Sequence, residues 1–120
     1  MTPAHPRRVL IVEDEMMVAM LVEDMVHDLG HEVVGPAMTL EVALQLAREE
    51  RVDCAILDMN LGQGVLSEPV ARALEARGVP FLFATGYGSK SVIEGFATAP
   101  VLKKPFVTGD LSRALHRLIA

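Results

Sequence analysis

Charged and hydroxyl side chains follow directly after short apolar runs at four places in the sequence. They are Glu13, Asp14 and Glu15 after residues 9–12, Asp58 after residues 54–57, Thr85 after residues 80–84, and Lys103 and Lys104 after residues 101–102. Carboxylates brought close together raise one another's pKa unless a cation neutralises them. Oxygen ligands without Cys or His select a hard ion, and Mg²⁺ suits a site with few protein ligands. With an ammonium and a hydroxyl nearby, such a site could receive a phosphoryl group on an Asp carboxylate.

Taken one at a time, these residues have simpler explanations. An acidic residue after a strand is often a helix N-cap, a Thr there is usually a turn residue, and a Lys is usually a solvated charge. The combination is more informative, because four separate segments carry it at the same end of an apolar run. Its meaning depends on a fold that brings those ends together.

Five apolar runs have the pattern of strands that are covered on both faces, which is continuous rather than alternating apolarity. The predicted strands comprise residues 9–12, 54–57, 80–84 and 101–102, with a weaker one at Glu32–Ala37.

Three stretches have the apolar spacing of helices. Their stripes consist of Val18, Leu21, Val22, Met25, Val26 and Leu29; of Leu40, Ala43, Leu44 and Ala47; and of Leu111, Ala114, Leu115, Leu118 and Ile119. Thr39 and Ser67 are predicted N-caps, and Pro69 and Gly78 mark the first turn and the end of a further helix. Residues 86–98 are the poorest helix, because they contain three glycines and each costs about 1 kcal/mol relative to Ala.

Strand and helix therefore alternate five times, which predicts a parallel sheet with helices on both faces. In such doubly wound α/β sheets, ligands bind beyond the carboxyl ends of the strands, where the strand order reverses. Those ends carry the acids, the Thr and the lysines described above. The sequence thus predicts one site at this edge of the sheet.

Length and charge narrow the class of protein further. The chain has 120 residues, which fits a single domain over 1–120, with residues 1–7 as an N-terminal tail. Its net charge of −5 argues against nucleic acid and against an anionic membrane surface as partners. The apolar runs are too short to span a bilayer and no signal peptide is evident, so we expect a cytoplasmic protein. The single cysteine, Cys54, is predicted to lie in the core.

Four segments of the chain carry a resemblance to a known family. They read VLIVEDE, AILDMNL, FLFATGYG and VLKKPF. With them the sequence resembles the receiver domain of bacterial two-component response regulators from Arg8 to Ile119. The text FATG further resembles a group of stand-alone receivers. The resemblance implies a flavodoxin-like (βα)5 fold with strand order 2-1-3-4-5.

The resemblance also implies roles for the residues that receive the phosphoryl group. Asp58 is similar to the phospho-accepting aspartate, and Thr85 to the hydroxyl that binds a phosphoryl oxygen. Lys104, directly before Pro105, is similar to the active-site lysine, and its spacing to the proline favours it over Lys103. The Lys104–Pro105 peptide is expected to be cis, as the one candidate in the chain.

For Mg²⁺, the resemblance implies a ligand set. Asp14 and Asp58 are expected to bind the ion directly, Glu13 through water, and Asn60 through its backbone carbonyl.

Three features depart from the family pattern. Val101 stands where receivers usually carry a Tyr or Phe that moves with the threonine. Gly62, followed by Gln63 and Gly64, stands where a Pro is expected, which predicts a looser loop. The glycines within residues 86–98 predict a segment that becomes ordered on phosphorylation.

Methionines on the first helix suggest a docking surface. Met20 lies opposite the apolar stripe and Met17 on its flank, and exposed Met suits adaptable contacts. In receivers this helix docks on the domain that carries the donor histidine, so Met17 and Met20 are the predicted contacts. His27 and His31 have ligand-like spacing, but Gly30 is expected to end the helix between them, and metal binding there is disfavoured.

The favoured function is a signalling switch that takes a phosphoryl group from a histidine kinase or histidine phosphotransfer protein onto Asp58. Such a switch modifies itself, so we expect no turnover substrate. Because the chain ends at Ala120, we also expect no output module, and an output by contact with an unknown downstream protein or by phosphorelay. Two alternatives stay open: an interaction module that needs no phosphorylation, and an Mg²⁺-dependent phosphohydrolase of the aspartyl-phosphate type. The second is disfavoured because Met16 and Asn60 stand where its additional Asp would be needed.

Overall fold

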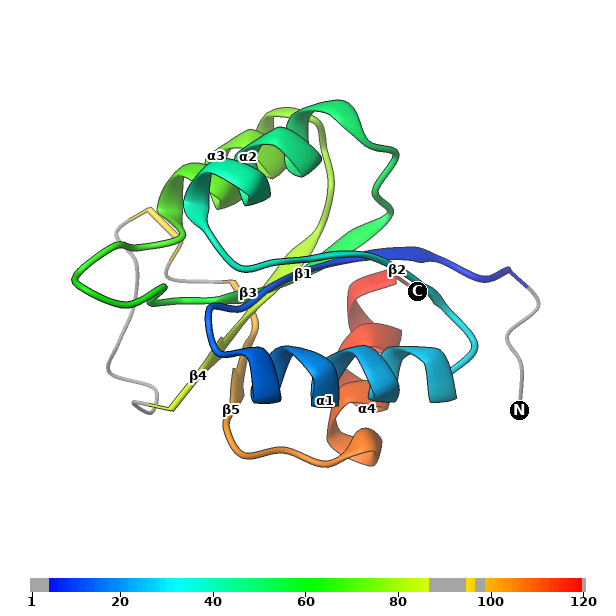
Figure 1. Ribbon diagram of the computed structural model, residues 1–120. Helices are drawn as coiled ribbons and strands as arrows, with labels where there is room; N and C mark the ends of the chain where they lie inside the picture. Colours follow the sequence, from blue (N-terminus) through cyan, green and yellow to red (C-terminus); the bar gives the residue numbers. More distant parts are fainter. Residues whose placement is uncertain (1–4, 87–94, 97–98, 120) are drawn as a thin grey trace.

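Five parallel strands form one sheet in the order β2-β1-β3-β4-β5 in the computed structural model (Figure 1). The structure describes residues 5–86, 95–96 and 99–119. The strands are β1 (Arg8–Val12), β2 (Glu32–Ala37), β3 (Cys54–Asp58), β4 (Phe81–Thr85) and β5 (Val101–Lys103). This confirms the predicted fold class and strand order. The predicted strands agree with the observed ones to within a residue at each end.

Four helices are found in the described part of the chain. They are α1 (Met16–Asp28), α2 (Leu40–Glu49), α3 (Glu68–Ala76) and α4 (Thr108–Ile119). Helices α2 and α3 cover one face of the sheet, and α1 and α4 cover the other (Figure 1). The helix predicted over residues 86–98 falls mostly on 87–94 and 97–98, which lie outside the described residues.

Side chains that alternate along the central strands fill two separate cores. In β1, Leu10 and Val12 pack in the core under α2 and α3, whereas Val9 and Ile11 pack in the core under α1 and α4. All five residues of β3 and of β4 are buried. Burial on both faces explains the unbroken apolar runs in the sequence. Cys54 is buried within β3, as predicted.

Two local predictions about the helices were wrong. Leu21, assigned to the core stripe of α1, is 58% exposed, because the buried face is centred instead on Ala19, Val22 and Val26. Ser67 precedes α3 but its side chain does not cap the helix. Its hydroxyl donates to the Met59 carbonyl at 3.4 Å.

Other local predictions were confirmed. The Thr39 hydroxyl accepts a hydrogen bond from the Val42 N–H at 3.3 Å and caps α2. The Lys104–Pro105 peptide is cis as expected, but it is not the one candidate, because the Gly35–Pro36 peptide in β2 is cis as well.

Candidate active site at the carboxyl edge of the sheet

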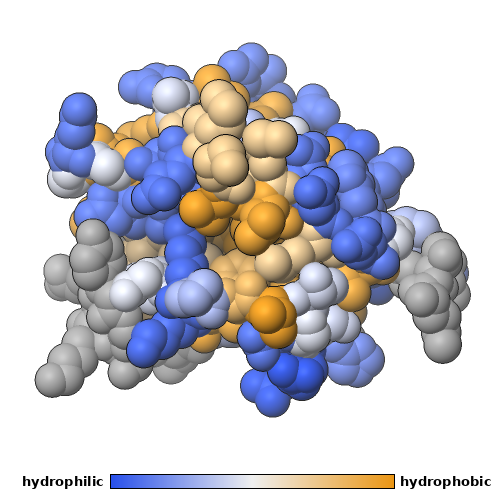
Figure 2. All heavy atoms as spheres, turned by 60° about the horizontal axis from the view of Figure 1, so that its bottom comes forward, coloured by the Kyte–Doolittle hydropathy of each residue, from blue (hydrophilic) through white to orange (hydrophobic). Residues whose placement is uncertain are grey.

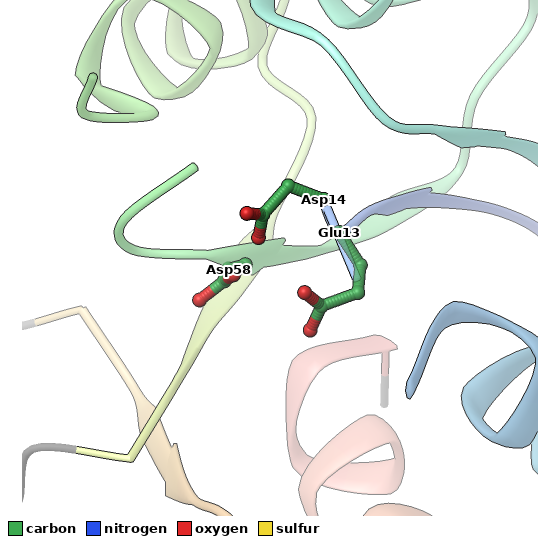
Figure 3. A group of neighbouring side chains, drawn as sticks. All are labelled: Glu13, Asp14 and Asp58. Carbon is green, nitrogen blue, oxygen red and sulfur yellow. The ribbon is translucent and has the colours of Figure 1, made fainter. Parts of the chain in front are cut away.

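Three carboxylates meet where β1 and β3 end. Val12 and Leu57 are paired in the parallel register of these neighbouring strands, so the residues that follow them emerge side by side. Glu13, Asp14 and Asp58 each offer an oxygen, and these oxygens all lie within 4.8 Å of one another. Figure 3 shows the three carboxylates gathered around one space. The acids predicted from the strand ends are therefore brought together.

Lys104 supplies a positive charge to this acidic group. Its Nζ donates a hydrogen bond to Glu13 and lies 3.4 Å from Asp58 Oδ1. The backbone holds the lysine in place, because the Lys104 N–H donates to the Thr85 carbonyl at 2.8 Å. Lys103 instead ends β5 with an exposed side chain. The geometry thus agrees with the choice of Lys104 over Lys103.

Thr85 and Asn60 occupy the same edge. Thr85 ends β4 and is buried. Asn60 follows β3 and lines a pocket together with Asp14, Asp58 and Lys104. Five of the six predicted site residues therefore surround one space, and Thr85 adjoins it through its backbone bond to Lys104.

Burial and like charge make ionisation of Asp58 unfavourable. They raise the pKa of this carboxyl to about 7, first through its removal from water and then through the negative charge of Glu13, with Lys104 opposing the shift. For Lys104, burial acts to lower the pKa, but the hydrogen bond to Glu13 and the nearby carboxylates outweigh it and raise the pKa above its ordinary value. One ammonium therefore does not neutralise the site.

The donor set fits a divalent cation. Among the described residues, three acidic side chains face a single lysine ammonium, and binding a cation relieves the repulsion among carboxylates that lie this close together. All the side-chain ligands offer oxygen, which selects a hard ion such as Mg²⁺. Glu13, Asp14 and Asp58 are the side chains that would hold it.

Sequence reasoning missed three contacts that shape the site. Glu13 is fixed at both carboxylate oxygens, because Oε2 also accepts the Glu15 N–H at 3.1 Å while Oε1 pairs with Lys104. Gly62 lies against the Asp14 carboxylate. No sequence signal gives the pairing of Glu13 with Lys104, because these residues are far apart in the chain. The sequence shows a glycine at position 62, but it does not show that this glycine lies against Asp14.

Comparison with known proteins assigns the chain to a family. The profile of the response regulator receiver domain matches residues 9–116. The chain belongs to the response regulator receiver family.

Solved receiver structures show the same fold. SdrG from Sphingomonas melonis Fr1 is 43% identical to this receiver, with a TM-score of 0.84 over 96% of this chain and 98% of SdrG. The receiver domain of PhyR from Erythrobacter litoralis is 27% identical, with a TM-score of 0.82 over 94% of this chain and 89% of that domain.

Curated relatives are longer than this receiver. The transcriptional regulatory protein PdtaR of Mycobacterium tuberculosis is 29% identical over 120 residues, which is 98% of this chain and 58% of PdtaR. The phyllosphere-induced regulator PhyR of Methylorubrum extorquens is 32% identical over 114 residues, which is 92% of this chain and 43% of PhyR. The chain thus spans about half the length of the curated relatives that it matches.

Val101, which the family resemblance singled out as a departure, lies on β5 and is 43% exposed.

In the described part of the chain, none of the helices combines the length and the apolarity that crossing a membrane requires.

Proposed function

We propose that this receiver accepts a phosphoryl group on Asp58 while Mg²⁺ is bound. The observation that carries the proposal is the meeting of Glu13, Asp14 and Asp58, whose oxygens lie within 4.8 Å of one another, with Lys104 beside Asp58. Of the three acids, Asp58 is the last residue of the central strand β3, and its Oδ1 lies 3.4 Å from Lys104 Nζ. Glu13 also contacts Lys104, but both of its carboxylate oxygens are already engaged, by Lys104 and by the Glu15 N–H. Asp58 is therefore placed to be a nucleophile that has an ammonium next to it.

The proposed reaction moves one phosphoryl group from a phosphohistidine. A carboxylate oxygen of Asp58 attacks the phosphorus, a phosphorus–oxygen bond forms, and the bond to the histidine nitrogen breaks, with its electron pair leaving on the imidazole. Lys104 offsets the charge that the phosphoryl oxygens bring to Asp58, and we assign the Thr85 hydroxyl to one of those oxygens. Asp14, Asp58 and the Asn60 carbonyl would hold Mg²⁺ directly and Glu13 would hold it through water, and the ion would supply charge neutralisation.

The proposal gives the receiver a role as a switch rather than as a turnover enzyme. It modifies itself, and its output is contact with a downstream protein or onward transfer of the phosphoryl group. The phosphodonor is a histidine kinase or a histidine phosphotransfer protein. We place the receiver in the cytoplasm, in keeping with its single, unpaired Cys54, because disulfides belong to oxidising compartments.

Incubation with acetyl phosphate tests the proposal directly. With Mg²⁺ present, the intact mass should rise by one phosphoryl group, and peptide mass spectrometry should place that group on Asp58. With a chelator in place of Mg²⁺, the mass should stay unchanged. A receiver that gains no phosphoryl group with Mg²⁺ would instead be an interaction module, and steady release of phosphate from an aryl phosphate would indicate a phosphohydrolase.

An apolar patch on α1 supports docking of the phosphodonor. Met16, Met17, Met20 and Leu21 are all exposed, with Met17 at 78%. Figure 2 looks onto the side of the molecule on which α1 and α4 lie, and apolar side chains gather near the centre of this face. Exposed apolar side chains that cluster in this way often mark a protein interaction site.

Replacing Met17 and Met20 together with Glu should slow phosphoryl transfer from a phosphohistidine protein about tenfold, because two apolar contacts are lost and two charges enter the interface. Uptake from acetyl phosphate should stay at the wild-type rate, since neither side chain lines the pocket. Val42→Glu is a matched control, because Val42 is an exposed apolar residue of α2 on the other face of the sheet. Equal transfer rates for both variants would remove the patch from the docking surface.

A further inference from the structure

The loop between β3 and α3 is held in one conformation by hydrogen bonds on both sides of Gly62. The Gly62 N–H donates to Asn60 Oδ1 at 2.8 Å, and the Gly62 carbonyl accepts the Val65 N–H at 2.9 Å. The Leu61 N–H donates to the Val65 carbonyl at 2.7 Å. These hydrogen bonds fix the backbone on both sides of Gly62 in the described conformation.

Gly62 faces a carboxylate of the site at close range. A Cβ built at this position would lie 3.0 Å from Asp14 Oδ2, which is shorter than ordinary van der Waals contact between carbon and oxygen. Gly62 also has a φ of +89°, a backbone conformation that residues with a side chain adopt only at a cost in free energy. Because hydrogen bonds hold the backbone on both sides of Gly62, whereas the contacted atom is the end of a side chain, the Asp14 carboxylate is the group that a Cβ at position 62 would displace.

We propose that Gly62 is a positioning residue for the cation site, because its missing side chain leaves the Asp14 carboxylate the space in which it meets Glu13 and Asp58. This inference rests on the Mg²⁺ site of the proposed function and adds to it a residue that determines how well the site binds its cation. The consequence is specific, since Mg²⁺ demands near-ideal octahedral geometry, whereas Ca²⁺ accepts varied geometry. A displacement of Asp14 by a few tenths of an ångström should therefore cost Mg²⁺ more than Ca²⁺.

Gly64 provides a matched control in the same loop. Its φ is +77°, and a Cβ built there would meet nothing within 4 Å among the described residues. Alanine at position 64 therefore enters a similar left-handed conformation without touching the site. Any difference between Gly62→Ala and Gly64→Ala isolates the contact with Asp14 from the conformational cost that both variants carry.

Isothermal titration of each protein with MgCl₂ and with CaCl₂, without any phosphodonor, tests the proposal. Gly62→Ala should bind Mg²⁺ about tenfold more weakly than wild type, whereas Gly64→Ala should stay within about twofold. The ratio of Ca²⁺ affinity to Mg²⁺ affinity should rise in Gly62→Ala alone, although thermal unfolding shows similar losses of stability in both variants. Gly62→Asn should show the same weakening of Mg²⁺ binding. Because asparagine tolerates positive φ better than alanine, this variant replaces Gly62→Ala if the alanine variant folds poorly.

Wild-type Mg²⁺ affinity in Gly62→Ala and Gly62→Asn would overturn the proposal, as would equal weakening in Gly64→Ala. The outcome is separable from that of the proposed function. A wild type that binds Mg²⁺ but gains no phosphoryl group would contradict the function and leave the role of Gly62 intact. A wild type that binds no Mg²⁺ would overturn both.

Discussion

The Asp58→Asn variant should gain no phosphoryl group from acetyl phosphate and Mg²⁺, yet be more stable than wild type when no metal is bound. An amide has no ionised oxygen to attack phosphorus, so uptake ends. The same change removes a buried negative charge from beside Glu13. A variant that is more stable but inactive separates a chemical role of Asp58 from a structural one.

The gain in stability should depend on pH in a defined direction. Folding raises the pKa of Asp58 from 3.8 to about 7, first by burial and then by the charge of Glu13. The folded protein therefore holds a proton that the unfolded chain has released, and wild type loses stability as the pH rises from about 4 to about 7. The amide side chain of the variant does not titrate, so its advantage should reach about 3 kcal/mol at pH 8 and fall below about half of that at pH 5.

Urea unfolding of the chelator-treated proteins at pH 5 and pH 8 measures this difference. Asp24→Asn is the control, because Asp24 is an exposed acid on α1 and its replacement should change the free energy of unfolding by less than about 0.5 kcal/mol. If Asp58→Asn were less stable than wild type at pH 8, the ion pair with Lys104 would outweigh the burial of the charge. Phosphoryl uptake by the variant would remove Asp58 as the acceptor.

Lys104→Met should lower the rate of phosphoryl uptake about 100-fold at saturating Mg²⁺, because a fixed positive charge next to the attacking oxygen is lost. It should also destabilise the metal-free protein by about 3 kcal/mol, since removing one partner leaves buried Glu13 and Asp58 without their cation. Time courses of mass gain measure the first effect, and urea unfolding with a chelator measures the second.

Lys103→Met is the matched control for this prediction. It makes the same chemical change one residue earlier, at an exposed side chain of β5, and should leave both the rate and the stability near wild type. Mg²⁺ should restore much of the stability of Lys104→Met, because the ion neutralises the acids, but not its rate. Equal uptake rates in the two variants would show that Lys104 does not act on the phosphoryl group.

The strands and most helix faces could be predicted because their signals are local. An unbroken apolar run such as the one in β3 indicates burial on both faces, and Thr39 before an amphipathic stretch indicates a helix start. The error in α1 arose where two neighbouring residues have similar local signals and tertiary packing decides which of them is buried. Leu21 and Ala19 are both compatible with a buried face of α1, and the folded protein buries Ala19 and leaves Leu21 exposed.

The sequence by itself determined which residues stand at the carboxyl ends of the strands, and hence which acids, lysine and threonine share one edge. It could do so because parallel strands end at one edge whatever their exact register. The tertiary structure alone decided that Lys104 pairs with Glu13 as well as Asp58, and that Gly62 lies against Asp14. Those contacts bring residues that are far apart in the chain to within a few ångströms of one another. Strand register and side-chain packing set such distances, and no local sequence pattern encodes them.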